Sequence, residues 1–155
     1  YDRAIMHEVV PFIQNRQGGP QGIIASGCSL GAYHAVNFAL RHPDVFWATV
    51  ALSGVFTVKH MIGDYLGSHA YLNSPLDYLP NLNDGWFLDR LRQNRLIVCS
   101  GQGAWEEPGL TDTRRLQQLF AEKGIGHWVD IWGHDVNHDW PWWLRQMPHF
   151  LGHLV

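Results

Sequence analysis

The fold is decided by the sequence Gly22-Ile23-Ile24-Ala25-Ser26-Gly27-Cys28-Ser29-Leu30-Gly31-Ala32. Residues 22–28 form a short run that is apolar on both sides, which is typical of a buried strand in a parallel sheet. From Leu30 to Arg41 the apolar residues recur at helical spacing. Residues 27–31 are therefore a G-x-S-x-G pattern at a strand-to-helix turn, and this pattern predicts a hydroxyl on Ser29 that stands clear of the sheet.

The residue types around Ser29 are those that a nucleophile at such a turn requires. A serine on so sharp a turn has a strained backbone, and flanking glycines avoid the clashes that side chains would cause. The helix N-terminus brings free N–H groups and the positive end of the helix dipole beside the serine oxygen. We therefore expect Ser29 to be the nucleophile and the backbone N–H of Leu30 to be an oxyanion donor; the alternative is an ordinary glycine-rich turn.

Strand and helix patterns alternate along the rest of the chain. An apolar helical pattern that includes Ile5, Val9, Phe12 and Ile13 precedes the first strand. After the elbow, we expect strands at 46–52, 96–100 and 128–132 and helices at 86–92, 111–123 and 141–154. This order predicts an α/β protein with a mostly parallel sheet of about four strands flanked by helices.

Residues 55–83 break the alternation. Gly, Asn, Pro, Tyr and His interleave with short apolar stretches there, and no period holds apart from a short helical pattern near residues 58–65. We expect an irregular, cap-like excursion within a single domain that spans residues 1–155. Tyr65 and the neighbouring tyrosines at 71 and 78 are placed to wall a substrate pocket.

The composition excludes several classes of partner. The chain has a formal net charge of −3 and 16% charged residues, so it lacks the basic surface that nucleic-acid binding requires. No apolar run approaches the roughly 20 residues of a membrane span. The pattern calls for no cofactor. The chain begins at Tyr1 within a predicted helix, and we expect it to be a processed or partial chain.

Cys28 and Cys99 both lie in strand-like apolar runs. If one strand separates them, their Cα atoms are about 10 Å apart, which is too far for a disulfide. We therefore expect two free thiols.

The elbow and its surroundings resemble a known family. Residues 26–35 and 38–46, with Ala51-Leu52-Ser53-Gly54 and the late His138-Asp139-Trp140, are similar to the putative esterase family of α/β-hydrolases, which includes esterase D-like carboxylesterases, feruloyl esterases and mycolyltransferases. The resemblance implies the C-terminal part of an α/β-hydrolase with a Ser-acid-His order along the chain. It implies a serine carboxylesterase that forms an acyl-enzyme; an acyltransferase of the same fold and a non-catalytic binding module are the alternatives.

The resemblance also indicates which residues would complete the triad. His138, immediately before the last helix, matches the catalytic histidine, and His134 is the alternative. The family's Gly-x-x-Glu pattern after the third strand fits Glu106, with Glu107 and Asp112 as alternative acids. The extra length of this loop relative to the family pattern leaves the register of the acid open. An ionised carboxylate is required here to orient the imidazole.

Four residues are candidates for the substrate pocket: Cys28, Trp105, Trp140 and Tyr65. Aromatic rings near the histidine could stack on a sugar or phenolic group, although packing of the last helix also explains the tryptophans at 140, 142 and 143. A metal site is a further alternative, because His134, Asp135, His138 and Asp139 place four donors in one loop. With the serine elbow present, we expect no metal.

The sequence lacks two parts of a complete hydrolase. No loop ahead of Ser29 could supply a second oxyanion donor, and strand 22–28 would be left as an unpaired apolar edge. We therefore expect an N-terminal complement, either on a separate chain or as a missing segment, to cover that edge. Pairing of two copies through the same edge is the alternative.

Overall fold

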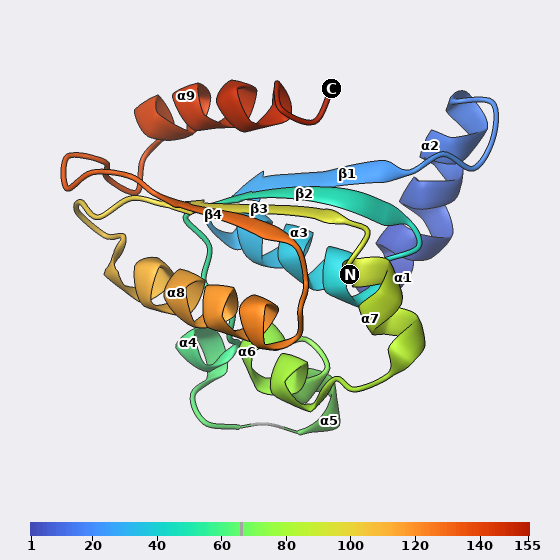
Figure 1. Cartoon of the computed structure of the whole chain (residues 1–155), viewed down its shortest axis with the longest axis horizontal. Helices are drawn as coiled ribbons and strands as arrows, with labels where there is room; N and C mark the ends of the chain where they lie inside the picture. The colour runs from blue at the N-terminus through green and yellow to red at the C-terminus, as the bar shows by residue number, and fades with distance from the viewer. Residues whose placement is uncertain (66) are drawn as a thin grey trace.

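The computed structural model describes residues 1–65 and 67–155, and its centre is a parallel sheet (Figure 1). The strands β1 (Ile23–Cys28), β2 (Phe46–Leu52), β3 (Arg95–Ser100) and β4 (His127–Ile131) lie in the order β1-β2-β3-β4. The predicted α/β class and the four parallel strands are confirmed. Because β2 separates β1 from β3, Cys28 and Cys99 are apart, and both are free thiols as expected.

Helices cover both faces of the sheet (Figure 1). The helices α3 (Leu30–Arg41) and α8 (Glu107–Glu122) lie on one face, and α9 (Trp140–Leu151) lies on the other. Strand β2 serves both cores, because Ala51 packs on the α3 side while Val50 and Leu52 pack with α9. Successive side chains of a strand point to opposite faces of the sheet, and both faces are packed against helices here. This explains why residues 46–52 do not alternate between apolar and polar side chains.

The two strands at the ends of the sheet differ from the two central strands. Most residues of β2 and β3 are buried, whereas β1 is largely half-buried and its Ser26 is exposed. Among the described residues, β1 pairs with β2 on one side only. The helix before β1 leaves Phe12 61% exposed. The first strand therefore presents an open hydrogen-bonding edge beside exposed apolar side chains.

The helix before β1 forms as predicted, and a π-helical turn interrupts it. It runs as α1 (Asp2–Ala4), a π-helical turn η1 (Ile5–Val9) and α2 (Val10–Arg16). Val10 is its buried residue, whereas Val9 and Phe12 are exposed. Pro11 cannot donate to the residue four positions earlier, and a wider turn before it accommodates the missing hydrogen bond. Of the apolar residues in the predicted pattern, Ile5 and Ile13 are half-buried, and Ile5 packs against the core.

The excursion at residues 55–83 contains short helices rather than open loop. These are α4 (Lys59–Ile62), α5 (Ser68–Tyr71), α6 (Pro75–Tyr78) and the 3₁₀ turn η2 (Leu79–Asn81). The segment lies against the helix layer of α3 and α8 rather than on the sheet itself (Figure 1). Asp112 of α8 ties it down by accepting a 2.7 Å hydrogen bond from the Phe56 N–H.

The remaining helices differ from the prediction only at their ends. The helix α7 (Gly85–Leu91) begins after Asp84, whose carboxylate accepts hydrogen bonds from the N–H groups of Trp86 and Phe87. The helix α8 begins one turn earlier than expected, because Pro108 is well suited to the first turn of a helix. Over residues 1–65 and 67–155, no helix is both long and apolar enough to cross a bilayer.

Candidate active site

Ser29 occupies a left-handed turn between β1 and α3. Its φ is 55°, which is an unusual conformation for a residue with a side chain, and its N–H donates a 2.8 Å hydrogen bond to Leu52 O on β2. A Cβ on Gly27 would lie 2.4 Å from the Gly31 carbonyl carbon, so only glycine fits there. A Cβ on Gly31 would meet nothing outside its own helix. We expected both flanking glycines to be needed to avoid side-chain clashes, and the structure shows this need for Gly27 but not for Gly31.

His138 approaches Ser29 from the loop between β4 and α9. Its Nε2 lies 2.9 Å from the Ser29 Oγ, across 109 positions of sequence. The backbone N–H of His138 donates to Ala104 O at 3.0 Å, and the Trp143 ring packs edge-on against the imidazole at 5.0 Å. The backbone hydrogen bond and the packing of the Trp143 ring thus fix the position of the imidazole within reach of the Ser29 hydroxyl proton.

Glu106 lies behind the imidazole. Its Oε2 is 3.8 Å from His138 Nδ1, and the residue is 1% exposed. The Oε1 accepts a 2.6 Å hydrogen bond from Ser53 Oγ, and Ser100 Oγ lies 3.2 Å from Oε2. A buried carboxylate is stable when its oxygens have such partners. The structure therefore brings Ser29, His138 and Glu106 together at the carboxyl edge of the sheet.

Hydrogen bonds between two loops fix the relation of Glu106 to His138. The Gly103 N–H donates to Val136 O at 2.9 Å, and the Ala104 N–H donates to Asn137 Oδ1 at 2.8 Å. A Cβ on Gly103 would lie 2.2 Å from that same Asn137 oxygen, so the loops meet only because residue 103 is glycine. Trp105 then takes a left-handed turn, with φ 67°, just before Glu106.

The two alternative acids lie elsewhere. Glu107 is exposed in the first turn of α8. Asp112 is buried, but its carboxylate accepts from the Phe56 N–H and contacts His60 Nε2 at 3.2 Å. Its oxygens are used in tethering the excursion to α8. Among the three candidate carboxylates, Glu106 is the one that faces His138.

The Leu30 N–H lies at the first position of α3, immediately after Ser29. Within the described part of the chain it has no backbone acceptor. A free N–H at this position, at the positive end of a 12-residue helix, can donate to an oxyanion formed at Ser29.

Of the four residues proposed for the substrate pocket, the two tryptophans lie near the loop of His138, whereas Cys28 and Tyr65 have other surroundings. Trp140 stacks edge-on against Trp143 at 5.3 Å, and Trp105 is 87% exposed beside the loop that holds His138. Cys28 is half-buried and packs with the α9 core, where burial raises the pKa of its thiol and keeps it protonated. Tyr65 is exposed in the excursion, and among the described residues no hydrogen bond or ring contact joins it to Ser29, His138 or Glu106.

The tyrosines at 71 and 78 lie away from Ser29. They line a pocket with Leu40 and Arg41, at the far end of α3 from the serine. Tyr78 is also tied to α3 by a 3.2 Å hydrogen bond from its hydroxyl to Asn37 Oδ1. The Tyr78 hydroxyl therefore helps to hold the excursion against α3.

The loop donors do not form a metal cluster. His138 Nε2 faces Ser29, and the Asp139 carboxylate accepts from the Trp140 N–H at the start of α9. In the chain outside residue 66, no group of three or more His, Cys, Asp or Glu side chains is arranged to hold a metal ion.

Two residues at the site were missed by reasoning from sequence. The sequence indicates Ser53 only as part of the family resemblance, and Trp143 only as a packing residue or a ring that could stack on substrate. The structure places the Ser53 hydroxyl on Glu106 and the Trp143 indole N–H on Ser53, at 2.9 Å. A polar Ser-Gly pair directly after a predominantly buried strand is the available signal for Ser53.

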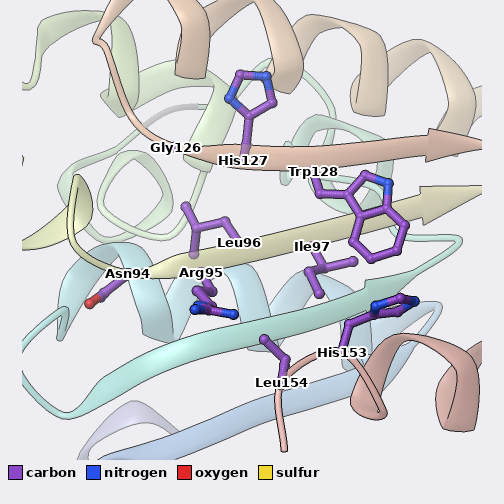
Figure 2. Close-up of a pocket in the computed structure, with 9 residues that line it drawn as sticks. All are labelled: Asn94, Arg95, Leu96, Ile97, Gly126, His127, Trp128, His153 and Leu154. Atoms are coloured by element: carbon purple, nitrogen blue, oxygen red, sulfur yellow. The ribbon is translucent and has the colours of Figure 1, made fainter.

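A pocket of about 440 Å³ lies at the opposite end of the sheet (Figure 2). Residues from the amino ends of β3 and β4 and from the turn after α9 line it, as the close-up shows. One of them, Asn94, donates hydrogen bonds from its side-chain amide to Pro43 O and Phe46 O, both at 2.9 Å. Because this pocket lies at the amino ends of the strands, it contains none of the three residues gathered at Ser29.

Solved structures share this fold over almost the whole chain. A ferulic acid esterase matches with a TM-score of 0.78 and 22% identity, over 97% of this chain and 59% of its own. Mycobacterium tuberculosis MPT51 (FbpC1) matches with a TM-score of 0.68 and 16% identity, over 99% and 67%. FphF, a fluorophosphonate-binding serine hydrolase of Staphylococcus aureus, matches with a TM-score of 0.67 and 18% identity, over 95% and 60%. This chain thus spans 59% of the first of these structures.

A comparison with curated protein sequences gives no match. The family model described as "Putative esterase", in contrast, matches residues 1–154. That match covers the elbow, the loop of Glu106, the loop of His138 and all four strands. The chain therefore belongs to the putative esterase family of α/β-hydrolases.

Proposed function

We propose that this chain carries the catalytic centre of a serine hydrolase that cleaves carboxylic esters. The observation that carries the proposal is the 2.9 Å contact between Ser29 Oγ and His138 Nε2, made at a left-handed turn on the N-terminus of α3. A neutral imidazole within hydrogen-bond reach can accept the proton of the serine hydroxyl as the oxygen attacks, which makes that oxygen a stronger nucleophile. Membership of the esterase family supports an ester as the bond attacked.

The reaction follows from the positions of these groups. Ser29 Oγ forms a bond to the ester carbonyl carbon while its proton passes to His138 Nε2, and the carbonyl oxygen becomes an oxyanion beside the Leu30 N–H. The carbon–oxygen bond to the alcohol then breaks, and the alcohol leaves with the proton from His138. Water then attacks the acyl-serine carbonyl carbon while one of its protons passes to His138 Nε2. The bond from that carbon to Ser29 Oγ breaks, His138 returns the proton to Oγ, and the carboxylic acid leaves.

Glu106 is the orienting acid in this proposal. An imidazolium forms on His138 during each step, and a buried carboxylate behind Nδ1 stabilises that charge. The 3.8 Å separation exceeds a hydrogen bond. Catalytic hydrogen bonds are often long before substrate binds, and we expect this one to shorten when His138 gains its proton.

The free edge of β1 is the second part of the proposal. We propose that an N-terminal polypeptide segment, joined to this chain or separate from it, pairs with β1 and supplies the second oxyanion donor. The half-buried β1 and the exposed Phe12 support this, because a long open edge with apolar neighbours favours association. The molecular mass of the purified protein, measured by light scattering, tests this proposal. A mass that includes a second, different polypeptide supports the N-terminal segment, and the mass of a homodimer supports pairing of two copies through β1. A stable monomer of these 155 residues contradicts both.

Hydrolysis of p-nitrophenyl acetate tests the catalytic assignment. We expect p-nitrophenolate release by the wild type and its loss in Ser29→Ala. Added alcohol distinguishes hydrolysis from acyl transfer, because a transferase yields the new ester and a hydrolase yields mainly acetate. An inactive wild type that still binds esters would instead support a binding module, and equal activity in Ser29→Ala would contradict the proposal.

A further inference from the structure

We infer that Ser53 and Trp143 are positioning residues, which hold the carboxylate of Glu106 in place for His138 through a chain of two hydrogen bonds. The inference rests on the proposed serine hydrolase and deepens it. It concerns residues that touch neither the nucleophile nor the imidazole nitrogens. Its basis is the path from Trp143 Nε1 to Ser53 Oγ at 2.9 Å and from Ser53 Oγ to Glu106 Oε1 at 2.6 Å.

The direction of both hydrogen bonds is fixed by the groups at the ends of the path. An indole N–H can only donate, and an ionised carboxylate can only accept. The Ser53 hydroxyl therefore accepts from Trp143 and must donate its single proton to Glu106. Hydrogen bonds that polarise one another in this way are strengthened in a buried setting, and all three side chains are buried, with Ser53 only 2% exposed.

The path holds the carboxylate at the oxygen that faces away from His138. Ser53 binds Oε1, which leaves Oε2 turned toward His138 Nδ1. Ser100 Oγ also lies near Oε2, at 3.2 Å, but it has a second acceptor in Gly101 O at 3.1 Å. A hydroxyl with one proton cannot satisfy both acceptors fully. Ser53 is therefore the committed donor to this carboxylate.

Trp143 contacts both partners of the acid–imidazole pair. Its ring lies edge-on against the His138 ring at 5.0 Å, while its N–H begins the path to Glu106. One rigid side chain on α9 thereby fixes the spacing between the end of β2 and the loop that carries His138.

The backbone of Ser53 is strained, which supports a role beyond packing. Its φ is 55°, the same value as that of Ser29, and Trp105 at φ 67° is the third left-handed residue with a side chain in the described chain. All three lie at the carboxyl edge of the sheet, next to Glu106 or His138. Strain of this kind persists where the surroundings enforce it and gathers at functional sites. Glycine would meet the backbone requirement at residue 53 with less strain, yet the position carries a hydroxyl.

The test measures kcat and KM for p-nitrophenyl acetate in Ser53→Gly, Trp143→Phe and the double variant. Ser53→Gly relieves the left-handed turn but leaves the Trp143 N–H and Glu106 Oε1 without their buried partner, so we expect a modestly lower Tm together with a kcat about tenfold lower and an unchanged KM. Trp143→Phe keeps the ring against His138 and removes only the N–H, so we expect a kcat about threefold lower. The double variant should match Ser53→Gly, because the two residues act along one path.

A kcat of Ser53→Gly within about twofold of the wild type overturns the inference. Losses that multiply in the double variant overturn the path through Trp143 and leave two independent contacts. Wild-type activity that survives Ser29→Ala removes the proposed function, and the inference falls with it. The Ser29→Ala arm therefore distinguishes the two failures.

Discussion

Two serines at neighbouring strand ends share the same positive φ but differ in their chemistry. Ser29 ends β1 and Ser53 ends β2, both have φ 55°, and each N–H continues the ladder to the next strand, to Leu52 O and to Cys99 O. The hydroxyl of Ser29 faces an imidazole nitrogen. That of Ser53 faces a carboxylate oxygen.

The partner decides which serine can be a nucleophile. His138 can accept the Ser29 proton when the oxygen attacks, and the Leu30 N–H lies ready for the negative charge that follows. Loss of a proton from Ser53 would place an alkoxide against the Glu106 carboxylate in a buried site, which is strongly unfavourable. Serines of the same φ therefore provide a reactive hydroxyl at one strand end and a fixed donor at the other.

The largest effect separates the two serines directly. We expect Ser29→Ala to lower kcat by a factor on the order of 10⁴ or more, because no other group forms the acyl-enzyme. Ser53→Ala should lower it by only about tenfold. Steady-state rates with p-nitrophenyl acetate check this, and comparable losses in the two variants would show that the two strand ends are not distinct in role.

The next effect concerns the acid that Ser53 holds. Glu106→Gln keeps the size of the side chain and removes its charge, and we expect kcat to fall by a factor on the order of 10³. Glu107→Gln, one residue along and exposed, is the matched control and should retain wild-type kcat. A larger loss in the control would move the acid to Glu107.

A smaller effect, on stability, tests the turn at Ser29. Gly27→Ala places a Cβ against the Gly31 backbone, and we expect the free energy of unfolding to fall by about 3 kcal/mol. Gly31→Ala meets nothing outside its helix and should be neutral or stabilising by a few tenths, up to about 1 kcal/mol. Urea denaturation measures both, and equal destabilisation would contradict the tight approach at Gly27.

The smallest effect concerns Asp112, the buried carboxylate outside the site. Asp112→Asn keeps an acceptor for the Phe56 N–H but removes the charge beside His60, and we expect a loss of about 1 kcal/mol with unchanged kcat. Denaturation and steady-state rates on the same samples provide the measurement. A large loss of kcat at full stability would make Asp112 part of the catalytic centre.

Local sequence predicted the elements whose cause is local. The G-x-S-x-G turn, the buried strand at 46–52 and the free thiols follow from residue types and spacing, and the structure has each of them. The π-helical turn in the first helix was not predicted, because the effect of Pro11 on the backbone hydrogen bonds is not visible in the apolar spacing. Glu106 and His138 were reached through family resemblance rather than spacing.

The role of Ser53 could not be predicted, because its two side-chain partners come from distant parts of the chain. Trp143 is 90 positions away and Glu106 is 53 positions away. Only the parallel sheet order brings the end of β2 beside both, and no periodicity encodes that neighbourhood.

Covalent labelling with a fluorophosphonate probe, read by intact mass and peptide mapping, tests the central claim most directly. The account predicts one adduct, on Ser29, absent in Ser29→Ala and formed more slowly in Ser53→Gly. An adduct on Ser53 or on any other residue, or no adduct on a protein that hydrolyses esters, would contradict it.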